Sequence, residues 1–151
     1  VVICSWFDEF KDPENFGERI DIFKTNLLKN FLYPISKHTK FIPEIWFYTT
    51  IAAAQYKFAY IPEPLRMFYD DVTNNRLGRS NIAKHAEGHY ISRAIMLKEI
   101  PTEVFVSNPM AWAKSIVRFG QCANSLGVPI FKRIEDTNLN YALISYLFRF
   151  M

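Results

Sequence analysis

Acidic side chains stand at three places where proton transfer or cation binding is chemically feasible. Glu44 follows a proline and precedes an aromatic run. A helix N-terminus favours its ionised form and apolar surroundings oppose it, so two roles stay open: a general base in a dry pocket, or a charge at a helix start. The pairs Asp8-Glu9 and Asp70-Asp71 each follow a strand-like run, and adjacent carboxylates can hold a cation or take part in acid–base catalysis. For Asp8-Glu9 we favour the simpler interpretation, polar loop residues.

Two histidines have the spacing of metal ligands on one helix. His85 and His89 are four residues apart and share one side of a helix, as zinc binding requires. Glu87 lies two residues from each of them, about 200° round the helix, and cannot serve a metal that both hold. The sequence offers no obvious third ligand. We therefore favour two imidazoles at the edge of an apolar helix face over a metallohydrolase.

The composition limits the size of the fold and the kinds of partner that the chain can have. The chain has 151 residues, of which 50% are hydrophobic and 22% charged, enough for one domain with a sizeable core. The net charge of +3 is too small to imply nucleic acid as a partner. Residues 1–75 hold 8 basic and 10 acidic side chains, and residues 76–151 hold 10 and 5. The second half would favour an anionic neighbour such as a diphosphate or a lipid surface, although we favour a solvated basic face.

Other whole-chain features concern cellular location. Cys4 and Cys122 are too few for a disulfide framework, and we expect both to be reduced packing residues. No apolar run reaches the ~18 residues that span a bilayer. The chain opens inside an apolar run with no start methionine and no signal-peptide pattern, so we expect a piece of a longer protein, cut at its N-terminus.

The elements that must position these residues change along the chain. The patterns predict a buried strand over residues 1–7, a loop over 8–17, a short strand over 19–23, a short helix over 25–30, and an enclosed helix over 43–55 with Pro43 at its first position. Strands over 57–61 and 65–69 flank a bend at two prolines, and a polar loop covers 70–78. Helices then follow over 80–100, 108–119 and 138–151. The pattern is strands mixed with helices, then helices alone.

Several segments in this order resemble bacterial family 2 glycosyltransferases of the GT-A fold. Phe41-Ile42-Pro43-Glu44 is similar to an F-x-P-E variant of the family's acidic E-D motif, and the helix after it also matches. The other matching segments are residues 1–5, 17–28, 56–66 and 69–74. The resemblance covers about residues 1–80. The D-x-D half of the family is absent, and a Glu stands where the family's E-D pair ends in Asp.

The resemblance implies an α/β fold: residues 1–79 would be the C-terminal part of a GT-A (Rossmann-like) nucleotide-sugar transferase domain, and residues 80–151 a helical extension. It implies an inverting transferase, with hexosyl transfer expected, that moves a sugar from a nucleotide-sugar donor to a glycan or lipid-linked acceptor in cell-envelope polysaccharide synthesis. Glu44 would be the general base, and Trp46 would wall the acceptor side. The expected substrate-binding loop holds Tyr69, Asp70, Asp71, Thr73, Asn74, Arg76 and Arg79. Mn²⁺ or Mg²⁺ would be held mainly by residues of the missing half, and the isolated fragment would be inactive.

A non-enzymatic module is the alternative. The basic helices over 80–100 and 108–119 and the aromatic last helix would then dock on a membrane or on a protein partner. For the enzyme we expect a cytoplasmic location, at the inner face of the membrane when peripheral contact occurs, and self-association is also compatible with the sequence.

Overall fold

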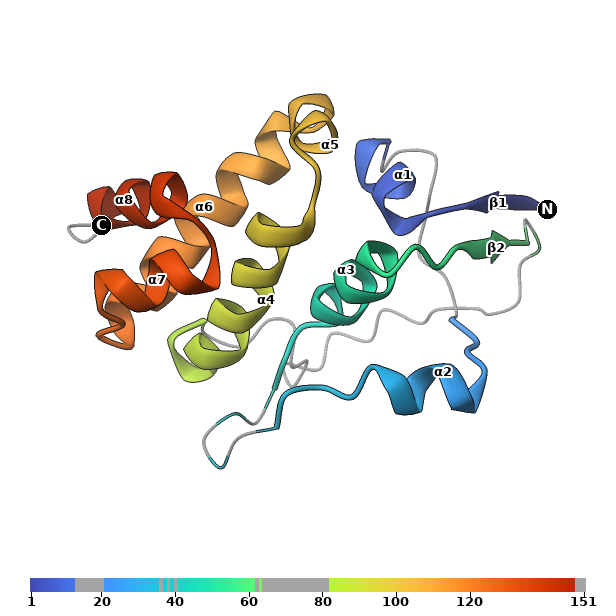
Figure 1. Cartoon of the computed structure of the whole chain (residues 1–151), viewed down its shortest axis with the longest axis horizontal. Helices are drawn as coiled ribbons and strands as arrows, with labels where there is room; N and C mark the ends of the chain where they lie inside the picture. Colours follow the sequence, from blue (N-terminus) through green and yellow to red (C-terminus); the bar gives the residue numbers. More distant parts are fainter. Residues whose placement is uncertain are drawn as a thin grey trace, which may run out of the picture.

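The computed structural model describes residues 1–12, 21–35, 37, 39, 41–61, 63 and 82–148. Figure 1 shows the strands and α1 to α3 on one side and the helices from α4 onward on the other. In chain order the described elements are β1 (Val2–Cys4), α1 (Trp6–Lys11), α2 (Thr25–Asn30), α3 (Ile45–Ala53), β2 (Phe58–Tyr60), the 3-10 turn η3 (Ile82–His85), α4 (Ala86–Glu99), α5 (Thr102–Ser107), α6 (Pro109–Ser125), α7 (Ile130–Asp136) and α8 (Leu139–Leu147).

The two strands form an antiparallel pair in which Val2 faces Tyr60 and Cys4 faces Phe58. β1 is shorter and less buried than the predicted strand over residues 1–7, because Val2 and Ile3 are exposed. The chain turns into α1 at Trp6, so the loop expected over 8–17 was wrong for its first residues. The reason is local: the side chain of Ser5 accepts a hydrogen bond from the Asp8 backbone N–H, and the Asp8 carboxylate accepts one from the Ser5 backbone N–H, which closes a capping box.

The helices expected from periodicity are present. Residues 25–30 form α2, the helix expected over 43–55 is α3, and the last predicted helix is α8. α3 begins at Ile45 with Glu44 as its N-cap, two residues later than Pro43 suggested. The start predicted near Asn108 is confirmed, because Asn108 Oδ1 accepts a hydrogen bond from the Ala111 N–H at 3.2 Å. Two short helices, α5 and α7, were not predicted, and residues 21–23 do not form the expected strand.

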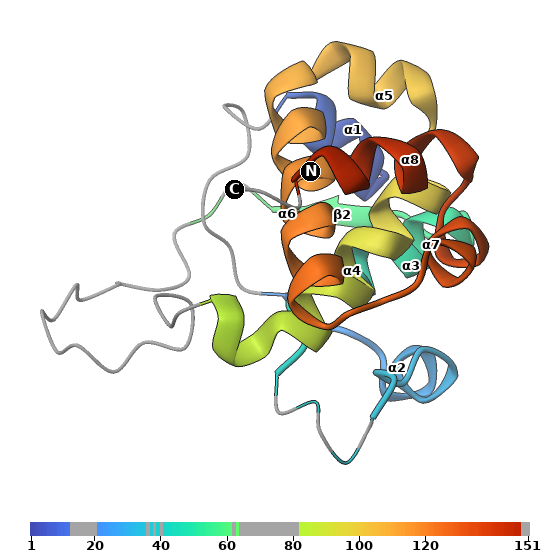
Figure 2. The same cartoon turned by 90° about the vertical axis from the view of Figure 1, so that its left-hand side faces the viewer.

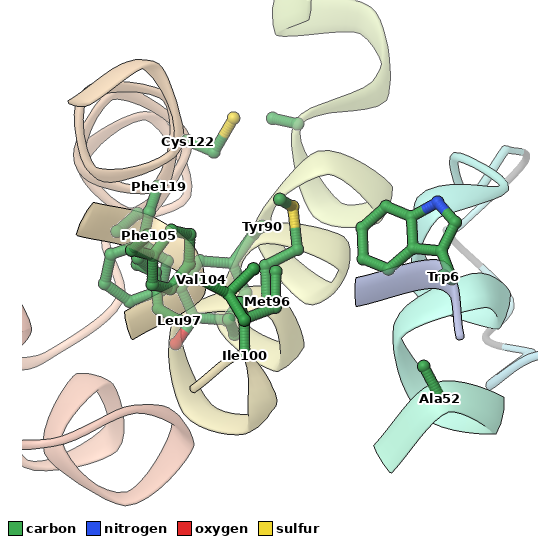
Figure 3. Close-up of a cluster of buried hydrophobic side chains, with 13 residues drawn as sticks. Trp6, Ala52, Tyr90, Met96, Leu97, Ile100, Val104, Phe105, Phe119 and Cys122 are labelled. Carbon is green, nitrogen blue, oxygen red and sulfur yellow. The ribbon is translucent and has the colours of Figure 1, made fainter. Parts of the chain in front are cut away.

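The core lies between α4 and α6 and extends to α1 and α3. The face of α4 that points into the core carries Ala86, Tyr90, Ala94 and Leu97, which are all buried. The Tyr90 ring stacks on Phe119 of α6 with centroids 5.1 Å apart. Figure 3 shows these rings gathered between the two helices, with Trp6 and Ala52 coming from the side of α1 and α3.

α2 lies at the edge of the molecule in both views (Figures 1 and 2). None of its residues is buried. No helix in the described ranges combines the length and the apolar character that crossing a membrane needs.

Candidate functional site

The segment 41–44 carries Glu44 and rests on α4 at Gly88. A β-carbon at position 88 would stand 1.8 Å from the Phe41 carbonyl oxygen and 2.8 Å from the Phe41 carbonyl carbon. Only glycine permits this approach of two backbones. The Phe41 ring also contacts His85 and His89, with centroid distances of 5.4 and 6.1 Å. The segment that precedes α3 is thus held against a helix that begins more than forty residues later.

Glu44 is the N-cap residue of α3. Its backbone carbonyl accepts a hydrogen bond from the Tyr48 N–H at 3.1 Å, but its side chain makes no capping bond. The side chain is exposed, although none of the nine residues of α3 that follow it is. The described residues therefore do not build the dry pocket that the apolar run suggested for this carboxylate. The Glu44 carboxylate is instead accessible to solvent at the start of an enclosed helix.

Glu44 is also distant from the two-stranded sheet. The sheet follows the C-terminal end of α3, and Glu44 precedes its N-terminal end (Figure 1). Nine helical residues separate the two ends by about 13 Å. The described residues thus do not bring Glu44 to a sheet edge, where the resemblance implied that the donor would bind.

Tyr33 packs on the first turn of α3. Tyr33, which precedes the segment, lies 5.1 Å from Trp46 between ring centroids and 6.1 Å from Phe47, on which it stacks. Burial, and then the charge of Glu44, raise the pKa of the Tyr33 hydroxyl. Tyr33 was not identified from the sequence, because it stands in an irregular stretch before a proline with no periodic signal.

A second carboxylate reaches α3 from another part of the chain. The Tyr48 hydroxyl donates a hydrogen bond to Asp21 Oδ2, and Asp21 precedes α2. Asp21 lies within one of the segments on which the family resemblance rests, yet nothing in the sequence singled it out as a site residue. Its partner on α3 shows that the chain before α2 is tied to the helix that Glu44 begins.

The remaining predicted site residues separate into three groups. Trp46 lies in the first turn of α3, two residues after Glu44, and its ring packs on Tyr33. Asp8 is occupied by its capping bonds with Ser5, which lower its pKa, and Glu9 accepts a hydrogen bond from the Tyr60 hydroxyl at 2.8 Å, so both have structural partners in or near α1. The last group lies outside the described residues: Tyr69, Asp70, Asp71, Thr73, Asn74, Arg76 and Arg79.

The described residues do not bring three His, Cys, Asp or Glu side chains together as a metal site. His85 is buried and His89 is partly buried, both against Phe41. A set of ligands for Mn²⁺ or Mg²⁺ is therefore not formed within the described residues.

Comparison of the chain with protein-family models, with curated proteins and with solved structures gives no match. The features that bear on function are an accessible carboxylate at the start of α3, the rings of Tyr33 and Trp46 packed on the first turn of that helix, and a preceding segment fixed to α4 at Gly88.

Proposed function

We propose that the chain is the C-terminal part of an inverting glycosyltransferase of the GT-A type, in which Glu44 is the general base. The observation that carries the proposal is the position of Glu44: an exposed carboxylate at the start of α3, on whose first turn the rings of Tyr33 and Trp46 pack together. The C–H face of a sugar ring packs well on the negative face of an aromatic ring. An acceptor sugar that lies on these rings would have its hydroxyl groups within reach of the carboxylate.

The proposed chemistry is a single displacement. Glu44 takes the proton of the acceptor hydroxyl as the oxygen attacks the anomeric carbon of the donor. The new bond forms on the face opposite the departing nucleoside diphosphate, so the configuration inverts. The segment 41–44 positions the base, because its backbone is fixed to α4 at Gly88. Such fixing lowers the entropic cost of orienting base and acceptor.

The sheet also fits an incomplete domain. β1 and β2 form a two-stranded pair with exposed Val1, Val2 and Ile3, and a pair of strands is marginally stable by itself. In the proposed enzyme, further strands and the donor-binding residues would come from sequence outside these 151 residues. The enzyme would act in the cytoplasm on a nucleotide-sugar donor and a glycan or lipid-linked acceptor at the inner face of the membrane.

The test is Glu44→Gln in the enzyme that contains both halves. Substitution of the base should lower transfer by about 100-fold or more, while donor binding stays within about twofold of the parent. Release of nucleoside diphosphate in the presence of acceptor measures the first, and donor-induced thermal stabilisation measures the second. Glu103→Gln is the matched control, since Glu103 is another exposed glutamate in the first turn of a helix. Near-normal transfer by Glu44→Gln would refute the base assignment.

One observation favours the alternative, a docking module. Leu139, Leu143 and Leu147 of α8 are exposed and lie four residues apart, so they form an apolar stripe on one helix face. Such a stripe can rest in a membrane interface. Replacement of the three leucines by serine should abolish sedimentation with phosphatidylglycerol vesicles if this function is correct. Ile35→Ser is the control, because Ile35 is an exposed apolar residue outside α8. Vesicle binding that survives the triple substitution would exclude this function.

A further inference from the structure

Four basic side chains gather where α4 meets α6. His89 and Arg93 are four residues apart and share one face of α4, and His85, the last residue of η3, stands four residues before His89. Arg118 lies on α6, the helix that packs along α4, and burial followed by the charge of Arg118 lowers the pKa of both His89 and Arg93. We call these four residues the basic cluster.

The basic cluster has no acidic partner in the part of the chain that the structure describes. Arg93 Nη1 reaches only Met96 Sδ at 2.9 Å and Ser115 Oγ at 3.4 Å. Arg93 Nε, both ring nitrogens of His85 and His89 Nδ1 are buried, and they have no hydrogen-bond partner among the described residues. His85 is only 7% exposed.

The burial of these nitrogen atoms lowers the stability of the folded protein, because they lose their hydration and form no hydrogen bonds in exchange. Another buried arginine shows the usual solution. Arg133 donates hydrogen bonds to Val128 O, Ser145 Oγ and Asn124 Oδ1 at 2.8–3.0 Å. Arg93 has no comparable set of acceptors among the described residues. A bound anion would supply both the acceptors and the missing negative charge.

We propose that the basic cluster binds a tetrahedral oxyanion of the phosphate or diphosphate class. The planar guanidinium groups of Arg93 and Arg118 match the oxygen spacing of phosphate, and the imidazoles add further donors. His89, Arg93 and Arg118 are only partly buried, so part of each side chain is accessible to solvent, whereas His85 is buried. The Phe41 ring on His85 and His89 places the bound anion next to the segment that carries Glu44.

Two molecules could supply such a group, and this choice alone rests on the proposed function. One is the nucleoside diphosphate of a sugar donor and the other is the diphosphate of a lipid-linked acceptor. Both share the chemistry that the basic cluster recognises. Binding of the inorganic anion does not depend on transfer activity, so its failure and the failure of the Glu44 assignment are separate results.

The primary experiment is calorimetric titration of the chain with inorganic pyrophosphate at constant ionic strength. Saturable binding is expected, with the affinity at least about tenfold lower in Arg93→Gln/Arg118→Gln. The control is Lys98→Gln/Lys114→Gln, which removes the same charge from exposed positions on the same two helices and should change the affinity less than about twofold. Arg118→Gln alone guards against misfolding, because Arg118 is partly exposed and the described structure gives it no hydrogen bond. No saturable binding at millimolar pyrophosphate, or an equal loss in the lysine control, would overturn the proposal.

A second measurement tests the imidazoles. Sulfate keeps its charge across the range in which histidine titrates, so its affinity should rise as the pH falls from about 8 to about 6. The groups that face His89 are His85 and Arg93 of α4, Arg118 of α6 and the uncharged Phe41 ring. In His89→Gln this pH dependence should be reduced. An unchanged dependence would remove His89 from the site.

Titration with organic diphosphates then identifies the kind of molecule that carries the bound anion. A nucleoside diphosphate that binds at least tenfold more tightly than pyrophosphate identifies the donor, and farnesyl diphosphate with that advantage identifies a lipid-linked acceptor. Equal affinity for all three assigns the site to the inorganic diphosphate group alone. The Arg93→Gln/Arg118→Gln variant must weaken whichever probe binds best; if it does not, that probe binds elsewhere.

Discussion

Phe41 and Gly88 are in direct backbone contact: a β-carbon at position 88 would lie 1.8 Å from the Phe41 carbonyl oxygen. This contact joins the segment before α3 to the N-terminal half of α4. It also brings the Phe41 ring onto His85 and His89. The contact between Phe41 and Gly88 therefore fixes the segment that carries Glu44 against the part of α4 that carries His89.

Gly88→Ala should destabilise the protein. In a helix with open space at that position, alanine would stabilise by about 1 kcal/mol relative to glycine. Here the added methyl group meets backbone that cannot rotate away, so we expect the opposite sign and a loss of about 1–3 kcal/mol. Urea unfolding measures the change. Lys98→Ala on the exposed side of α4 is the control and should stay within about 0.5 kcal/mol of the parent. A higher unfolding midpoint for Gly88→Ala would contradict the contact.

Arg133 should be essential for the packing of α6, α7 and α8. Its guanidinium bonds three acceptors and lies over the Tyr146 ring, 4.5 Å from the centroid. Lysine is long enough to reach one acceptor but has no planar fork, so Arg133→Lys should cost about 2–4 kcal/mol. Lys132→Gln is the matched control. Lys132 pairs with Glu135 and Asp136 in solvent, and its loss should cost less than about 1 kcal/mol. Equal losses of unfolding free energy in the two variants would refute the role of Arg133.

Tyr90 should make stability fall in alkaline solution. Burial, and then the hydrogen bond that the hydroxyl donates to Asp136 Oδ2 at 2.6 Å, raise the pKa of Tyr90. The folded protein thus keeps a proton that the unfolded chain loses above about pH 10. The stabilisation is complete below that pH and disappears as the pH rises toward the folded-state value.

The measurement is the free energy of unfolding against pH in the parent and in Tyr90→Phe. Above about pH 10 the parent should lose up to about 1.4 kcal/mol per pH unit more than the variant, the equivalent of one proton. Lysine deprotonation affects both proteins equally and cancels in the difference. Parallel curves would show that Tyr90 ionises equally in the folded and unfolded states.

Cys122 should be chemically inert in the folded state. It is 1% exposed, and burial raises the pKa of its thiol to about 11 despite the opposing charges of Arg118 and Arg93. Because the thiolate is the reactive form, iodoacetamide at about pH 8 should modify Cys122 only through unfolding. Peptide mass spectrometry follows the modification, with the same chain in urea as the reference. Equal rates in folded and unfolded protein would contradict the burial.

The sequence by itself determined much of the local structure. Helices over residues 25–30, within 43–55 and from Asn108 onward follow from side-chain periodicity and capping residues, which act within a few positions of each other. The same rules could have found α1, because Ser5 and Asp8 form a capping box, but the apolar run of residues 1–7 was interpreted as a strand. α5 and α7 have six and seven residues, too short for a clear periodic signal.

Tertiary structure alone decided what surrounds the candidate residues. Sequence pattern identified Glu44 and Trp46, but whether the carboxylate is enclosed depends on segments distant in the chain, and the described ones leave it exposed. The pairing of Tyr33 with Trp46, the approach of Phe41 to Gly88 and the placement of Arg118 near Arg93 join residues 13 to 47 positions apart. Helical periodicity fixes which face of a helix is apolar, whereas the partner that covers the face is chosen by packing. For that reason the sequence identified Glu44 and the His85–His89 pair, whereas the packing of Phe41 on that pair could come only from the tertiary structure.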